Sequence, residues 1–138
     1  MELEQIKNVI KAGVNCDKWY CGNMEGKYEK AIGVYDSTNP GKPIMAIGGP
    51  ENQTYDKTEF MVLVHYTREP KEARKKAYEV YCYLLGKEFE IEGIRGFFEL
   101  LRKPVPVGAD ENSIYEYVID ATVYYEKKEG ENNGISSV

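Results

Sequence analysis

Hydrophobic residues recur at helical spacing in two segments of the chain. Within residues 1–12, aliphatic side chains alternate with charged ones at helical intervals, and Gly13 follows as a helix stop. The second segment runs from Pro70 to Gly86 and carries an apolar stripe along one side. Proline suits the first turn of a helix, and glycine suits the position after the last turn. The pattern therefore predicts two amphipathic helices.

Five further segments have the composition or the alternation of β-strands. Residues 31–35 and 43–47 flank a run of turn-forming residues and predict a hairpin. Residues 59–67 are apolar on both alternating faces, as in a central strand that is covered on both sides. A fourth strand is predicted at residues 97–101. Residues 114–125 alternate strictly, which predicts a long antiparallel strand with one face on the core.

These elements together predict the fold class. Strands outnumber helices and follow one another through turns, so we expect an α+β fold with a mainly antiparallel sheet of four to five strands and two main helices packed on one face. The sequence has no internal repeat and no linker, which predicts a single domain over residues 1–128. Residues 129–138 are polar and rich in Gly, Asn and Ser, and they predict a flexible tail. Residues 14–29 predict an irregular segment, and residues 48–57 and 103–113 predict two long polar loops.

Composition and charge narrow the function classes. The 138 residues are 42% apolar and 30% charged, as in a soluble globular domain. A net charge of −5 argues against a nucleic-acid binder that works by neutralising phosphates. The longest uninterrupted apolar run, residues 60–64, is too short to span a bilayer, and the first residues have no signal-peptide pattern. We therefore expect a protein without a membrane segment that is made in the cytosol.

The candidate catalytic groups do not form a known constellation. His65 is the only histidine, and no triad or dyad motif accompanies it. The glycines at positions 48 and 49 lack the rest of a phosphate-binding loop. Glu116 and Asp120 share one face of a predicted strand, where paired acids are ordinarily just solvated. The sequence thus predicts a protein that is not an enzyme, with no catalytic residue, no cofactor and a structural role for His65.

The three cysteines offer an alternative. An odd number of cysteines is typical of reduced thiols rather than of a disulfide framework. Ligand pairs of structural zinc sites sit about two to four residues apart and need a second pair. Cys16 and Cys21 are spaced more widely, and only Cys82 and His65 are left to complete four ligands. We therefore predict no metal site, and a small cytosolic metal- or ligand-binding domain that uses these four residues stays as an alternative.

Twelve tyrosines make up most of the aromatic content. A tyrosine has an apolar ring and one polar end, so it suits both the edge of a core and a contact surface between proteins. One interpretation is that the tyrosines cover the core edges, and the other is that they meet neighbouring subunits. For the second interpretation, the candidate interface residues are Tyr55, Tyr115, Tyr117, Asp110 and Glu111.

The order of elements resembles that of the tail terminator and minor capsid proteins of long-tailed bacteriophages. The resemblance rests on the turn segment DSTNPGKPIMAIGG, the strand-then-helix segment TEFMVLVHYTREPKEARKKAYEVYCYLL and the final strand segment SIYEYVIDATVYYEKK. It covers about Met1 to Lys128. It implies a structural virion protein that caps the tail tube as a ring, commonly a hexamer, and joins the tail to the head. No functional residue is carried over from the family.

The same resemblance implies partners and a location. The expected partners are other copies of the chain in the ring, the phage tail tube protein and the head–tail connector protein, with no membrane. DNA would pass through the ring without specific binding, because acidic side chains around the opening repel phosphates. The expected location is the head–tail junction of the virion, after assembly in the cytoplasm of the bacterial host. A head-side connector or head-completion protein of the same virion is the first alternative.

Overall fold

A single sheet built around two long strands dominates the structure. The structure is a computed structural model that describes residues 1–38 and 40–126. The described residues form two α-helices, one short 3₁₀ helix and seven strands. Their order is α1 (Leu3–Lys11), β1 (Lys18–Cys21), β2 (Ala31–Asp36), η1 (Pro50–Asn52), β3 (Tyr55–His65), α2 (Pro70–Leu84), β4 (Glu88–Ile91), β5 (Ile94–Leu100), β6 (Val105–Ala109) and β7 (Tyr115–Glu126).

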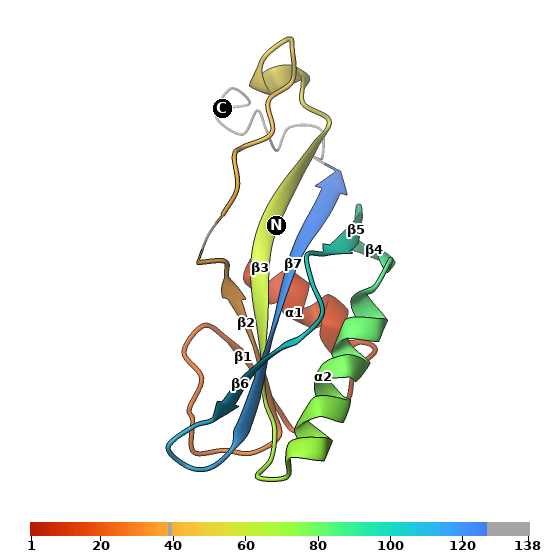
Figure 1. Cartoon of the computed structure of the whole chain (residues 1–138). Helices are drawn as coiled ribbons and strands as arrows, with labels where there is room; N and C mark the ends of the chain where they lie inside the picture. The colour runs from red at the N-terminus through yellow and green to blue at the C-terminus, as the bar shows by residue number, and fades with distance from the viewer. Residues whose placement is uncertain (39, 127–138) are drawn as a thin grey trace.

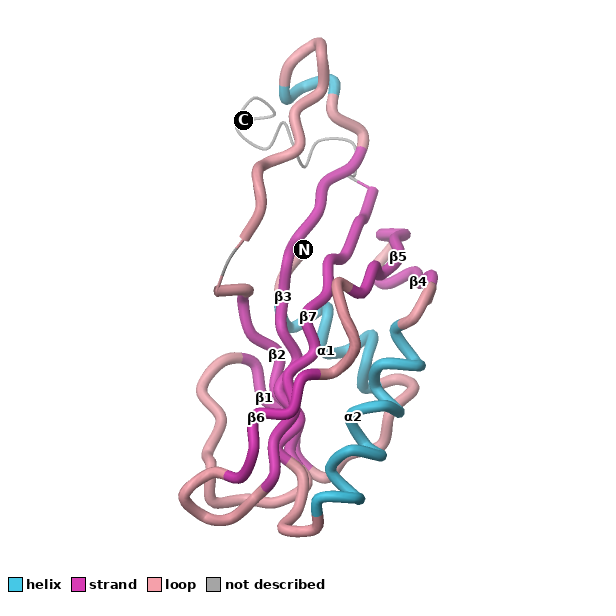
Figure 2. Tube along the Cα trace, viewed as in Figure 1, coloured by secondary structure: helices cyan, strands magenta, loops and turns pink. Residues whose placement is uncertain are grey.

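The long strands β3 and β7 pair with each other at the centre of the sheet (Figure 1). On the outer side of β3 lies β2, and β1 follows it in parallel orientation as one edge of the sheet. On the outer side of β7, β5 pairs with the C-terminal half of the strand and β6 with the N-terminal half. The strand β4 pairs with β5 and forms the second edge. The sheet is mixed and curled rather than flat (Figure 2).

The predicted fold class is wrong. We expected a mainly antiparallel sheet of four to five strands in an α+β fold, whereas the described residues form a mixed, curled sheet of seven strands, and the protein is mostly β. The missed strands β1, β4 and β6 are only four or five residues long, which is too short for a clear alternating pattern. Pro104 and Pro106 also made β6 resemble a loop, although a strand with a free edge tolerates proline.

The hairpin predicted between residues 31–35 and 43–47 is also wrong. Residues 43–47 form no strand, and the partner of β2 is β3, in a register that runs from Ala31↔His65 to Asp36↔Phe60. The turn-forming residues therefore begin a long connection instead of a tight turn. Local turn chemistry marked where β2 ends, but it carried no information about which strand pairs with β2.

Both predicted helices are confirmed, and so are the strands predicted over residues 59–67, 97–101 and 114–125, which correspond to β3, β5 and β7. The helix α2 has Pro70 in its first turn. Gly86 follows this helix with a φ of 68°, a backbone conformation that glycine adopts without strain. Long segments with a strong period were thus predicted correctly.

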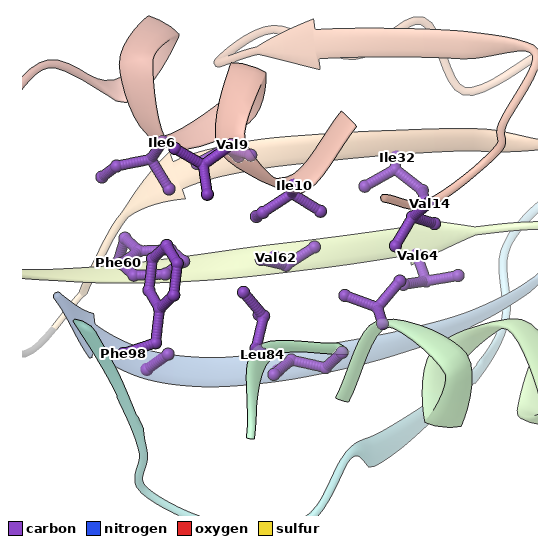
Figure 3. Close-up of a cluster of buried hydrophobic side chains, with 14 of the residues drawn as sticks. Ile6, Val9, Ile10, Val14, Ile32, Phe60, Val62, Val64, Leu84 and Phe98 are labelled. Carbon is purple, nitrogen blue, oxygen red and sulfur yellow. The ribbon is translucent and has the colours of Figure 1, made fainter. Parts of the chain in front are cut away.

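The core fills one face of the sheet beneath the two helices (Figure 3). Alternate residues of the two central strands point into it, and the side chains of α1 and α2 cover them. The buried side chains include Phe60, Val62 and Val64 of β3, Ile119, Ala121 and Val123 of β7, Ile6 and Ile10 of α1, and Val80 and Leu84 of α2. The prediction that β7 has one face on the core is therefore confirmed. The intervening residues of β3, His65 among them, lie on the opposite face.

The connection between β2 and β3 projects from one end of the sheet (Figures 1 and 2). Its residues 40–54, which include η1, are called the arm below. Two large apolar side chains in the arm, Met45 and Ile47, are 64% and 110% exposed. The start of β3, Tyr55 to Glu59, extends past the last paired residue of β2, so the arm is carried on a narrow part of the sheet. The arm thus presents apolar side chains away from the core.

Two predictions are not tested by the described residues. The polar tail predicted at residues 129–138 lies outside the described part of the chain. The single domain over residues 1–128 likewise stays a prediction. Within the described residues, neither helix is long and apolar enough to cross a membrane.

The two helices are fastened to each other through Tyr83. Its hydroxyl donates a hydrogen bond to the carbonyl oxygen of Val9 at 3.0 Å, and its ring lies directly against the backbone of Gly13. On the same helix, the buried Lys76 Nζ donates to the carbonyl oxygen of Asn15 at 2.8 Å. These contacts fix α1 and the segment after it against α2, so Gly13 has a packing role in addition to ending the helix.

A methyl group at position 13 should therefore destabilise the fold. The side chain of Gly13→Ala would overlap the ring of Tyr83, which must then move and lose its hydrogen bond to Val9. We expect a loss of about 1–3 kcal/mol in the free energy of unfolding, measured by urea denaturation. The control is Gly26→Ala, where the nearest atom to the new methyl group is 3.8 Å away. Equal stabilities of the two variants would contradict this account.

Candidate functional site

An aromatic groove opens at the end of the sheet where β4, β5 and β7 lie together. It has a volume of about 830 Å³ and is lined by side chains of β3, β4, β5 and β7. Phe97 of β5 and Tyr55 of β3 are 46% and 47% exposed. The rings of Phe97 and Tyr124 stack with centroids 5.1 Å apart and an interplanar angle of 15°. Large aromatic rings that face solvent side by side are typical of protein contact surfaces.

The groove depends on a tight hairpin between β4 and β5. Glu92 and Gly93 have φ values of 52° and 79°, which suits the two-residue turn that folds β4 back onto β5. Gly96 of β5 leaves room for the ring of Phe89, and any larger residue would overlap both that ring and the carbonyl oxygen of Tyr124. The absence of a side chain at position 96 is therefore what lets β4, β5 and β7 come together.

The rim of the groove is mainly acidic. Glu88, Glu90 and Glu126 line it together with one cation, Arg95, whose Nε forms an ion pair with Glu126. Both members of that pair are exposed, so their attraction adds little stability. Burial, and next the hydrogen bond that its hydroxyl donates to Glu99 Oε1 at 3.2 Å, raise the pKa of Tyr124. Apolar rings inside an acidic rim would suit a partner segment that is apolar and basic.

The predicted interface residues do not form one surface. Tyr55 lies in the groove, but Tyr117 packs against the core, and Tyr115 is half-buried with its N–H donated to the carbonyl oxygen of Thr67. The register of β3 and β7 places Tyr55 and the other two tyrosines at opposite ends of the ladder. For Tyr117, the structure favours the interpretation of a tyrosine at the core edge.

The predicted candidates Asp110 and Glu111 lie in the turn between β6 and β7. Asp110 is directed inward: its Oδ1 accepts hydrogen bonds from the N–H groups of Asn112 at 2.8 Å and Ile114 at 3.0 Å. Its other oxygen, Oδ2, lies 2.8 Å from Nε2 of His65. The side chain of Glu111 is exposed. Glu111 is therefore available for contact, whereas Asp110 holds the turn to the sheet.

The sequence predicted only a structural role for His65, but the structure places this histidine beside two acidic side chains. It is 1% exposed on the face of the sheet opposite the helices, and two carboxylates approach it. Burial by itself would raise the pKa of Asp110, but the hydrogen bonds from His65, Ile114 and Asn112 together lower it. Burial raises the pKa of Glu116, an acid that the sequence treated as solvated.

The cysteines do not join this cluster. Cys16 Sγ donates to the carbonyl oxygen of Lys30 at 2.9 Å, and Cys21 and Cys82 are exposed on separate elements. Burial raises the pKa of Cys16. The limited burial of the Cys21 sulfur, together with the neighbouring Glu4, raises the pKa of Cys21, so both thiols stay protonated at neutral pH. The structure therefore does not bring together the four residues of the metal-binding alternative.

The sequence missed Phe97, Tyr124 and Arg95 of the groove, and it missed the role of Glu116. The alternation along β7 did place Tyr124 and Glu116 on one face of the strand, and the core residues of the structure lie on the other face. Their neighbours across the sheet, Phe97 and His65, follow only from the register, which one sequence does not disclose.

A family model of bacteriophage tail terminator proteins matches residues 18–127, which is most of the chain. The chain belongs to this family. The match begins with β1 and includes α2 and every later strand. The resemblance to phage tail terminator proteins inferred from the sequence is confirmed. No curated protein matches it.

Because the pKa of Asp110 is lower in the folded state, the ionised carboxylate of Asp110 should stabilise the fold at neutral pH. A group with a lowered pKa in the folded state stabilises the fold above its unfolded pKa of about 3.9, and this stabilisation is lost as the pH falls through the folded-state value. We expect Asp110→Asn to lower the free energy of unfolding at pH 7 by about 1.5–3 kcal/mol, and by less at pH 3 than at pH 7.

Denaturation by urea between pH 7 and pH 3 measures this difference. The control is Glu111→Gln, which changes the adjacent exposed acid and should have little effect at any pH. A loss in Asp110→Asn that stays the same at all pH values would show that the charge of Asp110 is unimportant.

Proposed function

We propose that this chain is a tail terminator subunit that assembles as a ring, commonly of six copies, on the end of the tail tube and joins the tail to the head. The single observation that carries the proposal is the family match over residues 18–127. The proposed partners are other copies of the chain, the tail tube protein and the head–tail connector protein. The proposed place of assembly is the cytoplasm of the bacterial host.

The distribution of exposed apolar side chains supports assembly into a ring. Subunits in a ring contact each other through two different surfaces, one on each side. The groove with Tyr55 and Phe97 provides one such surface, and the arm with Met45 and Ile47 provides a second. The edge strands β1 and β4 also leave backbone N–H and C=O groups on their outer sides, which another strand can pair with. We propose that the groove, the arm and the exposed Glu111 take part in these contacts.

The charge of the chain supports passage of DNA without specific binding. A ring of subunits with a net charge of −5 each is strongly acidic. Acidic side chains around the opening would repel the phosphate backbone and keep DNA from adhering as it passes.

The family match favours the tail side of the junction over the first alternative, a head-side connector or head-completion protein. Among the described residues, no cysteine belongs to a group of three potential metal ligands, which disfavours the second alternative, a thiol-based metal- or ligand-binding domain. Because terminators of this family are structural, we propose no catalytic role.

Removing the exposed rings of the groove should impair assembly while the fold is kept. We expect Tyr55→Ser with Phe97→Ser to reduce capping of purified tail tubes at least about tenfold, because buried aromatic residues contribute most to interface energy. Electron microscopy of tubes mixed with the protein measures capping, and circular dichroism checks the fold.

The matched control is Val107→Ser, which removes another exposed apolar side chain, 56% exposed, on β6, the strand that pairs with the opposite end of β7. If the groove variant caps tubes as well as the unmodified chain does, the groove is not an interface. If the unmodified chain itself fails to cap tubes, the proposed function is wrong.

A further inference from the structure

Three potential ligand atoms meet on the face of the sheet opposite the helices. They are Nε2 of His65 on β3, a carboxylate oxygen of Asp110 in the turn after β6, and a carboxylate oxygen of Glu116 on β7. His65 Nε2 lies 2.8 Å from Asp110 Oδ2 and 3.9 Å from Glu116 Oε2. All three atoms lie within 4.8 Å of one another.

The fold brings these groups together by two separate devices. The register of the central strands sets His65 directly opposite Glu116. The pairing of β6 with β7 is interrupted between Pro106 and Gly108, and Gly108 has a φ of 98°, which a residue other than glycine adopts only with strain. The turn that follows directs Asp110 back over the sheet. Each ligand is therefore positioned by the backbone.

Asp110 is also oriented by its own hydrogen bonds. One oxygen, Oδ1, is occupied by the N–H groups of Asn112 and Ile114, so the other oxygen, Oδ2, is directed at His65. This arrangement fixes the carboxylate before anything binds to it. A preoriented ligand loses little conformational freedom on binding, which raises affinity.

The cluster holds one imidazole and two carboxylates. The imidazole of His65 presents Nε2 to Asp110. Glu116 is a second, partly buried carboxylate beside the first. Burial raises its pKa, the neighbouring His65 opposes this, and the charge of Asp110 adds to the rise. The other nitrogen of His65, Nδ1, is buried and has no hydrogen-bond partner in the described part of the chain. Two neighbouring acids and a buried imidazole are a donor set that a cation would complete.

We propose that His65, Asp110 and Glu116 form a binding site for a divalent transition-metal ion, Mn²⁺ or Zn²⁺. Imidazole favours transition metals, and carboxylates favour harder ions, so one imidazole with two carboxylates suits these two. Ligand atoms bound to one such ion at about 2.1 Å lie roughly 3–4 Å from one another. The spacings in the cluster are close to this range, and rotation of the Glu116 side chain, which no hydrogen bond in the described residues restrains, would bring the third ligand in.

One feature limits the affinity of the site. A cation on Nε2 leaves the ring proton on Nδ1, where no acceptor lies within hydrogen-bonding distance in the described residues. An unpaired buried donor is unfavourable. We therefore expect dissociation constants in the micromolar range rather than the much tighter binding of zinc-finger sites.

Such an ion would tie together three segments on this side of the molecule. Asp110 belongs to the turn that also carries Asn112, whose side chain donates to the carbonyl oxygen of Gly26 at 3.2 Å and whose own carbonyl accepts from Arg68 Nε at 3.1 Å. The ion would attach this turn to β3 and β7. Through Asn112, the same turn is hydrogen-bonded to the loop between β1 and β2. The site is a stabilising device for this surface, and it does not depend on the proposed function.

The experiment titrates Mn²⁺ into chelator-treated protein and follows the melting temperature and the electron paramagnetic resonance signal of free Mn²⁺. Mn²⁺ is the main probe because thiolates compete poorly for it, whereas Zn²⁺ would also bind the exposed Cys21 and Cys82. We expect loss of the free-ion signal with one ion bound per chain, and a melting temperature that rises as the site fills.

The variant Glu116→Gln separates a metal site from a purely structural cluster. Without metal, we expect this variant to melt at the same temperature as the unmodified chain or higher, because it removes a partly buried charge next to Asp110. With Mn²⁺, we expect the affinity of the variant to be at least about tenfold lower. Removing a group that only hydrogen-bonds to a metal ligand typically lowers affinity by about tenfold or more, and removing a ligand itself should cost at least as much.

The matched control is Asp120→Asn, an acid on the same face of β7 that lies near Arg102 and outside the cluster. It should bind Mn²⁺ as the unmodified chain does. Absence of Mn²⁺ binding to the unmodified chain would overturn the proposal. Equal binding by Glu116→Gln would overturn it as well, because the ion would then occupy some other place.

Discussion

The pairing of β3 with β7 is the interaction on which the rest of the structure depends. This ladder runs from Tyr55↔Glu126 to His65↔Glu116, and the remaining strands attach to its two outer sides. Because side chains alternate along a strand, one register decides which residues meet on each face. A slip of one residue would turn the apolar set of β3 away from the helices and would separate His65 from Glu116.

The same ladder joins two regions of different chemistry. At one end, Tyr55 and Tyr124 contribute to an aromatic groove with an acidic rim. At the other end, His65 and Glu116 approach each other on the face without helices. Backbone hydrogen bonds along the ladder keep these regions at a constant separation. In a family of structural proteins, a stiff spacer between contact surfaces is of direct use, because an assembly is accurate only if its subunits keep their shape.

The sequence predicted the parts of the fold that have a long period. The helix from Pro70 and the alternation along β7 extend over enough residues for amphipathicity to be clear. The sequence did not predict β1, β4 and β6, because each has too few residues on either face to show a clear alternation. It also did not predict which strand pairs with β2. The candidate sites show the same limit. Tyr55 was selected because tyrosine suits contact surfaces and this one lies in a predicted polar loop, whereas the meeting of His65 with Asp110 depends on a register break at Gly108.

The contribution of α1 to the core has a consequence for the boundaries of the domain. The family match begins at residue 18, after this helix. Yet Ile6 and Ile10 are fully buried against the sheet, and Tyr83 reaches from α2 to the backbone of α1. A fragment cut to the matched residues would keep every strand and still expose a strip of its interior to water. For this chain, the unit recognised by homology is smaller than the unit that folds.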